Sequence, residues 1–320
     1  MRWIKRIAFA VVALLVLLGI GLATLLYFLT SRVEGDYFDA NGFTIHYTVD
    51  GNATGEPVIL IHGLGANIDL NWRRPGTIGR LARDFHVISY DLRGHGLSDR
   101  SHDAADYGIE LVHDVFRMMD HAGLESAHLV GYSMGGFVAL KAAAENPERV
   151  RSVSVAAAGW RDPRSDEPLL KPYRSPQHQP RPIQEARIPN DPDFEGWGGR
   201  PFLVRLADPF RDYVGEKIGD EGSFRACKSD ESLESLQITQ EELEALTTPI
   251  ACFIGDDDGL LWYAHDLLEV RPDIAYFEYG RLNHLTLGMA GRFRRDLHAF
   301  LLENASGNSK PAVVAAPSGG

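Results

Sequence analysis

The stretch HLVGYSMGGFVAL, residues 128–140, joins two structural patterns across a single serine hydroxyl. A short apolar run leads into Gly131, Ser133 lies between Gly131 and Gly135, and apolar residues then continue at helical spacing. A strand, a tight turn and a helix in this order are typical of a nucleophile elbow. The glycines let the helix pack closely on the strand while the serine takes a strained backbone conformation. Small residues also suit an ordinary turn, so the rest of the chain decides whether Ser133 is a nucleophile.

The sequence around this stretch alternates between strand and helix patterns. Continuous apolar runs of the kind found in strands buried on both faces are PVILIHG, FHVISYDLRG, SAHLVGYS, VRSVSVAAAG, PIACFIGDDD and IAYFEYGR. Helical patterns such as IELVHDVFRMMDHAG separate them, and Asn41-Gly42 marks an earlier hairpin. This alternation predicts an α/β fold with a mostly parallel sheet flanked by helices.

A serine nucleophile needs a histidine base and a carboxylate that orients the base. His284 fits the base, because it follows the apolar run 274–279 late in the chain. Three carboxylates follow the preceding strand pattern, which should end at Gly255: Asp256, Asp257 and Asp258. We favour Asp258 as the acid, with Asp257 as the alternative.

Acyl transfer also needs donors for the developing oxyanion. The amide of Met134, the residue after the serine, is one expected donor, and the amide of Leu64 after His62-Gly63 is the other. Both are backbone N–H groups, so their side chains matter little. We expect His62 itself to be structural, because it precedes this turn.

The charged loop DLRGHGLSD, residues 91–99, has no place in this scheme. We expect Asp91, Arg93 and Asp99 to fix a loop through charge-assisted hydrogen bonds.

Taken together, residues 36–304 resemble the α/β-hydrolase fold superfamily, in particular its serine-esterase and haloperoxidase-like members. The resemblance is carried by HGLG at 62–65, DLRGHGLSD at 91–99, GYSMGG at 131–136, GDDDG at 255–259 and NH at 283–284. It implies that Ser133 is the nucleophile, His284 the base, Asp258 the acid, and Leu64 and Met134 the oxyanion donors. It also implies that neither a metal nor an organic cofactor is required.

Residues 160–247 interrupt the alternation, and we interpret them as a cap inserted after the sixth strand. They show no clear strand pattern, they are rich in aromatic residues, and ten of the chain's 17 prolines lie between Pro163 and Pro209. A structureless loop of this length is uncommon in a compact domain unless it is functional. The proline content departs from the usual helical cap, so substrate contacts cannot be transferred from the family.

The N-terminus predicts a transmembrane signal anchor. Residues 7–29 carry no charge, and a helix of 23 residues is about 35 Å long, enough to cross a hydrocarbon core of about 30 Å. A cleaved signal peptide and a buried core helix are the alternatives. Arg2, Lys5 and Arg6 precede the span, which predicts a cytoplasmic tail at residues 1–6 and an extracytoplasmic catalytic domain. We expect residues 305–320 to form a disordered tail.

Composition limits the partners. The formal net charge of −12 argues against nucleic acid binding, and two cysteines make neither a disulfide framework nor a zinc cluster. The expected partners are a small ester or acyl substrate and the membrane, and oligomeric state stays open.

The motifs lead to a serine hydrolase that cleaves carboxylic esters through an acyl-enzyme. An aromatic-rich cap close to a membrane favours lipophilic esters, although those aromatics could equally form the cap's own core. Three alternatives stay open: a carbon–carbon bond hydrolase acting on diketones with the same triad, a peptidase, and a non-catalytic ligand-binding protein of this fold.

Overall fold

A computed structural model describes residues 2–30, 33–164 and 219–305 of the 320-residue chain. Its centre is an eight-stranded sheet with the strand order β1-β2-β4-β3-β5-β6-β7-β8. The strands are β1 (Asp36–Ala40), β2 (Phe43–Gly51), β3 (Glu56–Ile61), β4 (Phe85–Tyr90), β5 (Ala127–Tyr132), β6 (Val150–Ala156), β7 (Ile250–Gly255) and β8 (Ala275–Tyr279). The strands from β3 to β8 are parallel to one another, and β2 pairs antiparallel with β1 and β4. The predicted mostly parallel sheet is confirmed.

The β1–β2 hairpin turns at Asn41-Gly42, as predicted. Ala40 pairs with Phe43, and both turn residues have positive φ angles, 59° at Asn41 and 87° at Gly42. Two consecutive positive φ angles define a type I′ turn, whose twist matches that of the flanking strands.

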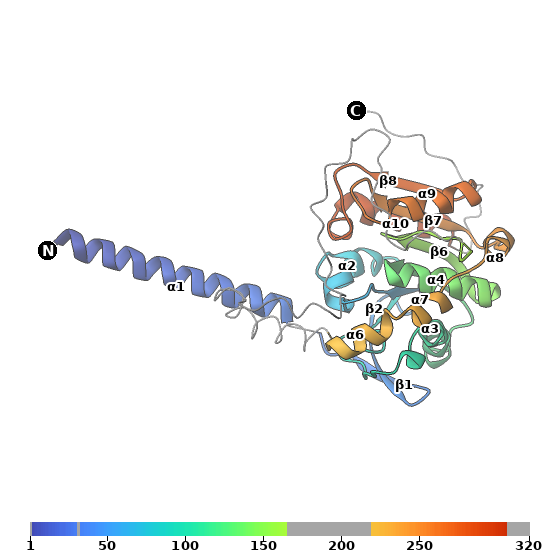
Figure 1. The fold of residues 1–320 in the computed structure, drawn as a ribbon, viewed down its shortest axis with the longest axis horizontal. Coiled ribbons are helices and arrows are strands. Elements are labelled where there is room, and N and C mark those ends of the chain that lie inside the picture. Colours follow the sequence, from blue (N-terminus) through green and yellow to red (C-terminus); the bar gives the residue numbers. More distant parts are fainter. Residues whose placement is uncertain (1, 31–32, 165–218, 306–320) are drawn as a thin grey trace, which may run out of the picture.

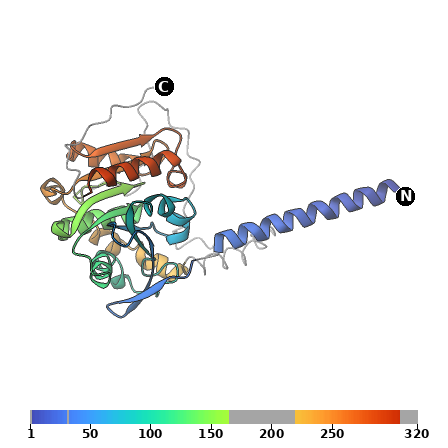
Figure 2. The ribbon, with the colours of Figure 1, turned by 180° about the vertical axis from the view of Figure 1, so that it is seen from behind.

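Helices cover both faces of the sheet (Figures 1 and 2). On one face α3 (Ile109–His121), α4 (Met134–Glu145) and α9 (Leu261–Val270) pack on the larger core, and on the other α2 (Thr77–Leu81) and α10 (Gly291–Glu303) pack on the smaller core. Ile59 belongs to the first core and its neighbour Val58 to the second, because successive strand side chains point to opposite faces. Strands buried on both faces explain the continuous apolar runs of the sequence.

Three short helices occupy the described part of the segment between β6 and β7. They are α6 (Glu221–Cys227), α7 (Asp230–Ser235) and α8 (Gln240–Ala245). Each begins at a polar N-cap, since Asp220, Ser229 and Thr239 accept hydrogen bonds from backbone N–H groups of the first turn. Residues 165–218 lie outside the described residues, so the cap as a whole stays a prediction. The same holds for the tail from residue 306 onward.

The N-terminal helix α1 (Arg2–Thr30) lies apart from the sheet and its helices in both views (Figures 1 and 2). Many of its described apolar side chains are exposed, Leu14 and Leu17 among them. Within the described residues, however, no helix combines the length and the apolar character needed to cross a membrane. The predicted membrane anchor is therefore not supported by the structure.

Candidate active site

Ser133 lies at a sharp turn between β5 and α4, where the sequence predicted it. Its φ of 52° and ψ of −120° are unusual for a residue with a side chain and mark local backbone strain. A Cβ at Gly131 would collide with the backbone oxygen of Gly135, and a Cβ at Gly135 would collide with the carbonyl of Ile61 in β3. These two glycines therefore let α4 start directly against the sheet, with Ser133 raised at the turn.

The structure brings Ser133, His284 and Asp258 into one hydrogen-bonded chain. His284 Nε2 lies 2.9 Å from Ser133 Oγ, and His284 Nδ1 lies 3.1 Å from each carboxylate oxygen of Asp258. In this arrangement the carboxylate holds the imidazole with Nδ1 protonated, which leaves Nε2 free to accept the serine proton. Ser133 lies 151 positions before His284 and Asp258 lies 26 positions before it, yet the three meet just beyond the carboxyl ends of β5, β7 and β8.

Only one of the three adjacent aspartates reaches His284. Asp258 is buried and also accepts the N–H of Leu260 at 2.9 Å. Asp257 is exposed, and Asp256 accepts the N–H of Arg281 instead. Because β7 ends at Gly255, as predicted, Asp258 is the residue that the following loop turns inward.

The turn after β3 lies against the serine. Ala66 N–H donates to the carbonyl of Gly63 at 3.2 Å, and a Cβ at Gly63 would stand 3.1 Å from that of Ser133. Within the described residues, the amides of Leu64 and Met134 donate no hydrogen bond. Both predicted oxyanion donors are thus unused N–H groups beside Ser133, with Met134 in the first turn of α4.

Tyr132 is a contributor that the sequence did not reveal. Its hydroxyl donates to the backbone carbonyl of His284 at 2.6 Å and accepts the N–H of Gly288 at 3.3 Å. Burial raises the pKa of this hydroxyl, which keeps it protonated and able to donate. Tyr132 therefore connects the elbow to the histidine loop. Its position beside Ser133 was visible in the sequence, but its partners depend on how two distant loops meet.

The loop at residues 91–99 is held as predicted. Asp91 accepts the N–H groups of Ile68 and Leu97, both at 2.9 Å, and Arg93 pairs with Asp114 at 2.7 Å. Asp99 accepts the N–H of Thr44 at 2.6 Å. Burial raises the pKa of the Asp91 carboxyl, but hydrogen bonds from His46 and these amides outweigh it and leave the pKa below its usual value.

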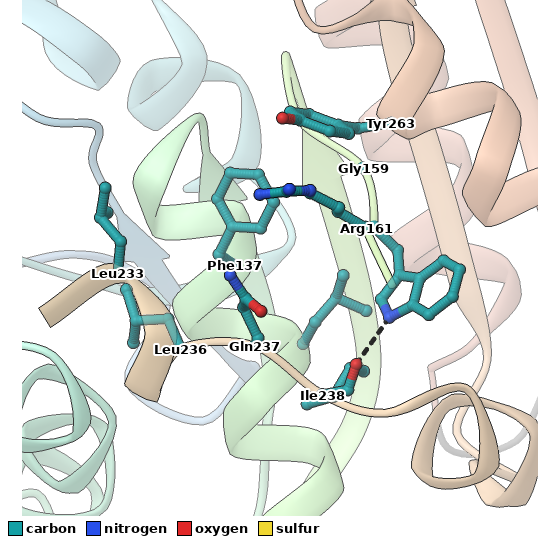
Figure 3. Close-up of a pocket in the computed structure, with 10 residues that line it drawn as sticks. Phe137, Gly159, Arg161, Leu233, Leu236, Gln237, Ile238 and Tyr263 are labelled. Carbon is teal, nitrogen blue, oxygen red and sulfur yellow. Dashed lines mark hydrogen bonds between the residues drawn. The ribbon is translucent and has the colours of Figure 1, made fainter. Parts of the chain in front are cut away.

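An apolar pocket lies beside helix α4 (Figure 3). Phe137, one turn along α4 from Ser133, faces it, and Tyr263 of α9 closes another side. Its lining residues are Phe137, Leu140, Gly159, Trp160, Arg161, Leu233, Leu236, Gln237, Ile238 and Tyr263. The Trp160 indole N–H donates to the Ile238 carbonyl at 2.8 Å and ties the end of β6 to the α7–α8 connection. The empty volume, including the part open to solvent, is about 500 Å³.

In the described part of the chain, the histidine, cysteine and acidic residues decide whether a metal site or a reactive thiol is present. No group of three or more histidine, cysteine or acidic residues there could hold a metal ion. Cys227 and Cys252 are free and buried, and burial raises the pKa of both thiols, that of Cys227 to about 12. The two thiols are therefore protonated at neutral pH.

Comparison with known proteins finds relatives over part of the chain. Over 127 residues the chain is 38% identical to a dihydrolipoyllysine-residue acetyltransferase component of an acetoin cleaving system from Cupriavidus necator, covering 39% of this chain and 33% of that one. Over 124 residues it is 38% identical to Lipase 1 of Psychrobacter immobilis, covering 38% of each. The chain thus spans little more than a third of the length of these relatives.

A similar solved structure covers far more of the chain. A mutant of the meta-cleavage product hydrolase CumD superposes with a TM-score of 0.59 at 25% identity, covering 84% of this chain and 98% of that one. The family model described as alpha/beta hydrolase fold matches residues 56–249, more than half of the chain. The chain belongs to the α/β-hydrolase fold family.

Proposed function

We propose that this protein is a serine hydrolase that cleaves carboxylic esters through an acyl-enzyme. The observation that carries the proposal is the continuous chain of hydrogen bonds from Ser133 Oγ through His284 to Asp258. Two unused amides beside the serine, those of Leu64 and Met134, add the electrostatic part of the site.

The reaction follows from these positions. His284 Nε2 accepts the proton of Ser133 as Oγ attacks the acyl carbon, and Asp258 stabilises the imidazolium that forms. The amides of Leu64 and Met134 donate to the oxyanion of the tetrahedral intermediate. The imidazolium then gives its proton to the leaving alcohol, and water activated by His284 releases the acid from Ser133.

The apolar pocket supports an ester with a lipophilic group. Its lining is mostly aromatic and aliphatic and includes Phe137, one helical turn from Ser133, which suits an alkyl or acyl chain. We expect kcat/KM to rise from the acetate to the hexanoate in a series of p-nitrophenyl esters, because each buried methylene contributes up to about 0.8 kcal/mol. A steady fall from acetate onward would contradict the lipophilic assignment.

The nucleophile is tested with a fluorophosphonate probe, which labels activated serines covalently. We expect the full-length protein to be labelled, Ser133→Ala to lose labelling, and Ser235→Ala to be labelled like the wild type. Ser235 is a matched control because its hydroxyl donates to the Ser232 carbonyl in α7, away from the triad. Unlabelled wild-type protein would favour a non-catalytic binding protein.

A second candidate is a carbon–carbon bond hydrolase. The specific observation in its favour is the superposition on a meta-cleavage product hydrolase over 84% of this chain. Parallel assays of p-nitrophenyl hexanoate and an aryl β-diketone separate the two reactions. Faster turnover of the diketone would replace the ester proposal.

We further propose that the N-terminal segment anchors the protein in a membrane, with the catalytic domain outside the cytoplasm. The support comes from the sequence: residues 7–29 lack charge and follow Arg2, Lys5 and Arg6. Alkaline extraction of membranes tests the anchor, and a reporter fused after residue 304 that is active only outside the cytoplasm tests the orientation. Release of the intact chain at alkaline pH would contradict the anchor.

A further inference from the structure

Two buried histidines hold the turn that carries the Leu64 amide. His62 Nδ1 lies 2.8 Å from the carbonyl of Gly63, and its Nε2 accepts the N–H of Leu92 at 3.0 Å. The Gly63 carbonyl and the Leu64 N–H belong to the same planar peptide group. His62 therefore orients the Leu64 N–H from the opposite end of that group.

His95 holds the next peptide group of the same turn. Its Nε2 accepts the N–H of Gly65 at 3.1 Å, and its Nδ1 lies 3.1 Å from the Arg93 carbonyl. Gly65 has a φ of 68°, as expected at the third position of a type II turn closed between Gly63 and Ala66. The middle peptide of such a turn can flip, and the bond to His95 holds it in one orientation.

Both rings must be neutral for these bonds to exist. A backbone N–H can only donate and a carbonyl can only accept, so each ring carries its hydrogen on Nδ1. Burial lowers the pKa of both histidines, that of His95 to about 3. The rings meet edge to face with their centroids 5.2 Å apart.

Helix α6 contacts His95, which holds the turn of Leu64, and the side chain of Met134. The Phe224 ring lies 5.0 Å from the ring of His95, centroid to centroid. Three residues later, Cys227 Sγ lies 3.5 Å from Sδ of Met134. The N-cap of α6, Asp220, also accepts a hydrogen bond from His102 at 2.9 Å, which ties the helix to the loop after β4.

We infer that His95 is a positioning residue for the oxyanion hole, and that α6 keeps it in place through Phe224. The inference rests on the proposed function, since it takes the Leu64 amide as a donor to the reacting oxygen. Neither His95 nor Phe224 touches the reacting atoms in this assignment. They act by holding the Gly63–Ala66 turn in the orientation that points the Leu64 N–H toward the substrate.

The test compares His95→Gln with His95→Phe in the full-length protein. A glutamine can place its amide oxygen near the position of Nε2 and accept the Gly65 N–H, whereas phenylalanine fills the space without an acceptor. We expect His95→Phe to lower kcat about 10- to 100-fold, up to the effect of removing one oxyanion donor. KM should change less than threefold, and His95→Gln should recover most of the lost kcat.

Hydrogen exchange supplies a readout that does not depend on turnover. We expect the Gly65 amide to exchange at least tenfold faster in His95→Phe and to stay protected in His95→Gln. Should His95→Phe fail to fold, Phe224→Leu gives the same comparison with smaller effects, a three- to tenfold loss of kcat and faster Gly65 exchange. Phe277→Leu is the matched control, because Phe277 is partly buried in β8 against Phe253.

The outcomes separate this inference from the proposed function. An unchanged Gly65 exchange rate in His95→Phe would overturn the inference, and so would an equal loss in the Gln and Phe variants. If Phe224→Leu shows a normal Gly65 exchange rate and normal turnover, α6 plays no part in holding His95. Full ester hydrolysis by Ser133→Ala would instead refute the proposed function, while the Gly65 exchange rates would still report on His95.

Discussion

The two ends of strand β5 each carry a serine, a histidine and a carboxylate in hydrogen-bonding contact. At the carboxyl end are Ser133, His284 and Asp258. At the amino end Ser152 Oγ lies 2.7 Å from His128 Nδ1, and His128 Nε2 lies 3.0 Å from Glu56. By residue type and distance alone, either set could be taken for a triad.

Access and backbone strain separate the two sets. The His284 side chain is 36% exposed, whereas that of His128 is fully buried, and so is Ser152. Ser152 belongs to the regular strand β6, whereas Ser133 has a φ of 52° at a turn. Of the two serines, Ser133 is the one followed by an amide, that of Met134, that donates no hydrogen bond within the described residues. The comparison teaches that a triad needs a nucleophile that substrate can reach and oxyanion donors, as well as three residues in contact.

The largest expected effect comes from exchanging each serine for alanine. Ser133→Ala should lower kcat about 10⁴-fold or more with little change in melting temperature, because triad members act as a unit. Ser152→Ala should keep kcat within about threefold, but it leaves a buried histidine nitrogen unsatisfied and should destabilise the fold by about 1–3 kcal/mol. Ester kinetics measure kcat, and chemical denaturation measures the free energy of unfolding, for both variants. Comparable losses of activity would remove the distinction between the two sets.

The carboxylates give the next effect. Asp258→Asn should lower kcat about 10⁴-fold, because asparagine favours the wrong tautomer of His284. Asp257→Asn serves as the matched control and should retain near-normal kcat, since Asp257 is exposed. If Asp257→Asn is the more damaging, the acid is one residue earlier than the geometry indicates.

The buried histidine should make stability depend on pH. Burial lowers the pKa of His128 more than Glu56 raises it, so the folded pKa is below the unfolded value near 6.5. Below pH 6.5 the unfolded chain then binds a proton that the folded chain does not. Its stabilising contribution is complete above pH 6.5 and is lost as the pH falls, by up to about 1.4 kcal/mol per pH unit.

The variant His128→Gln isolates this contribution from those of the other buried histidines. We expect the stability difference between wild type and variant to shrink from pH 7.5 to pH 5.5 in urea denaturation. A constant difference would mean that His128 titrates equally in the folded and unfolded states.

Local signals explain why the Ser133 cluster at the carboxyl end of β5 could be anticipated from the sequence and the His128 cluster at the amino end could not. The glycines around Ser133, the apolar run before it and the position of His284 after a strand are all readable along the chain. The His128 cluster depends on register, because His128 pairs with Ser152 across β5 and β6. No spacing in the sequence records that pairing.

The contacts of the Gly63–Ala66 turn and of α6 also could not be predicted, because they join residues far apart in the sequence. The bond from Gly65 to His95 crosses 30 residues, and the contact between Cys227 and Met134 crosses 93. The contact of Asp258 with His284 could be anticipated because the strand end at Gly255 could be read from the sequence. Its burial, which excludes Asp257, became visible only in the folded chain.

The smallest expected effect comes from removing the charge of Arg151, which lies beside the His128 cluster. Arg151 pairs with Glu56 at 2.9 Å, and it lowers the pKa of His128 by charge repulsion. Both ends of this ion pair are partly solvated, so Arg151→Met should cost about 1 kcal/mol or less at pH 7.5. It should also raise the pKa of His128, which NMR titration of the ring protons can follow.

The loss of stability between pH 7.5 and 5.5 should then be smaller in Arg151→Met than in the wild type, with ester hydrolysis unchanged. An increase in that loss would show that Arg151 supports the protonated histidine, and a fall in activity would connect the two ends of β5.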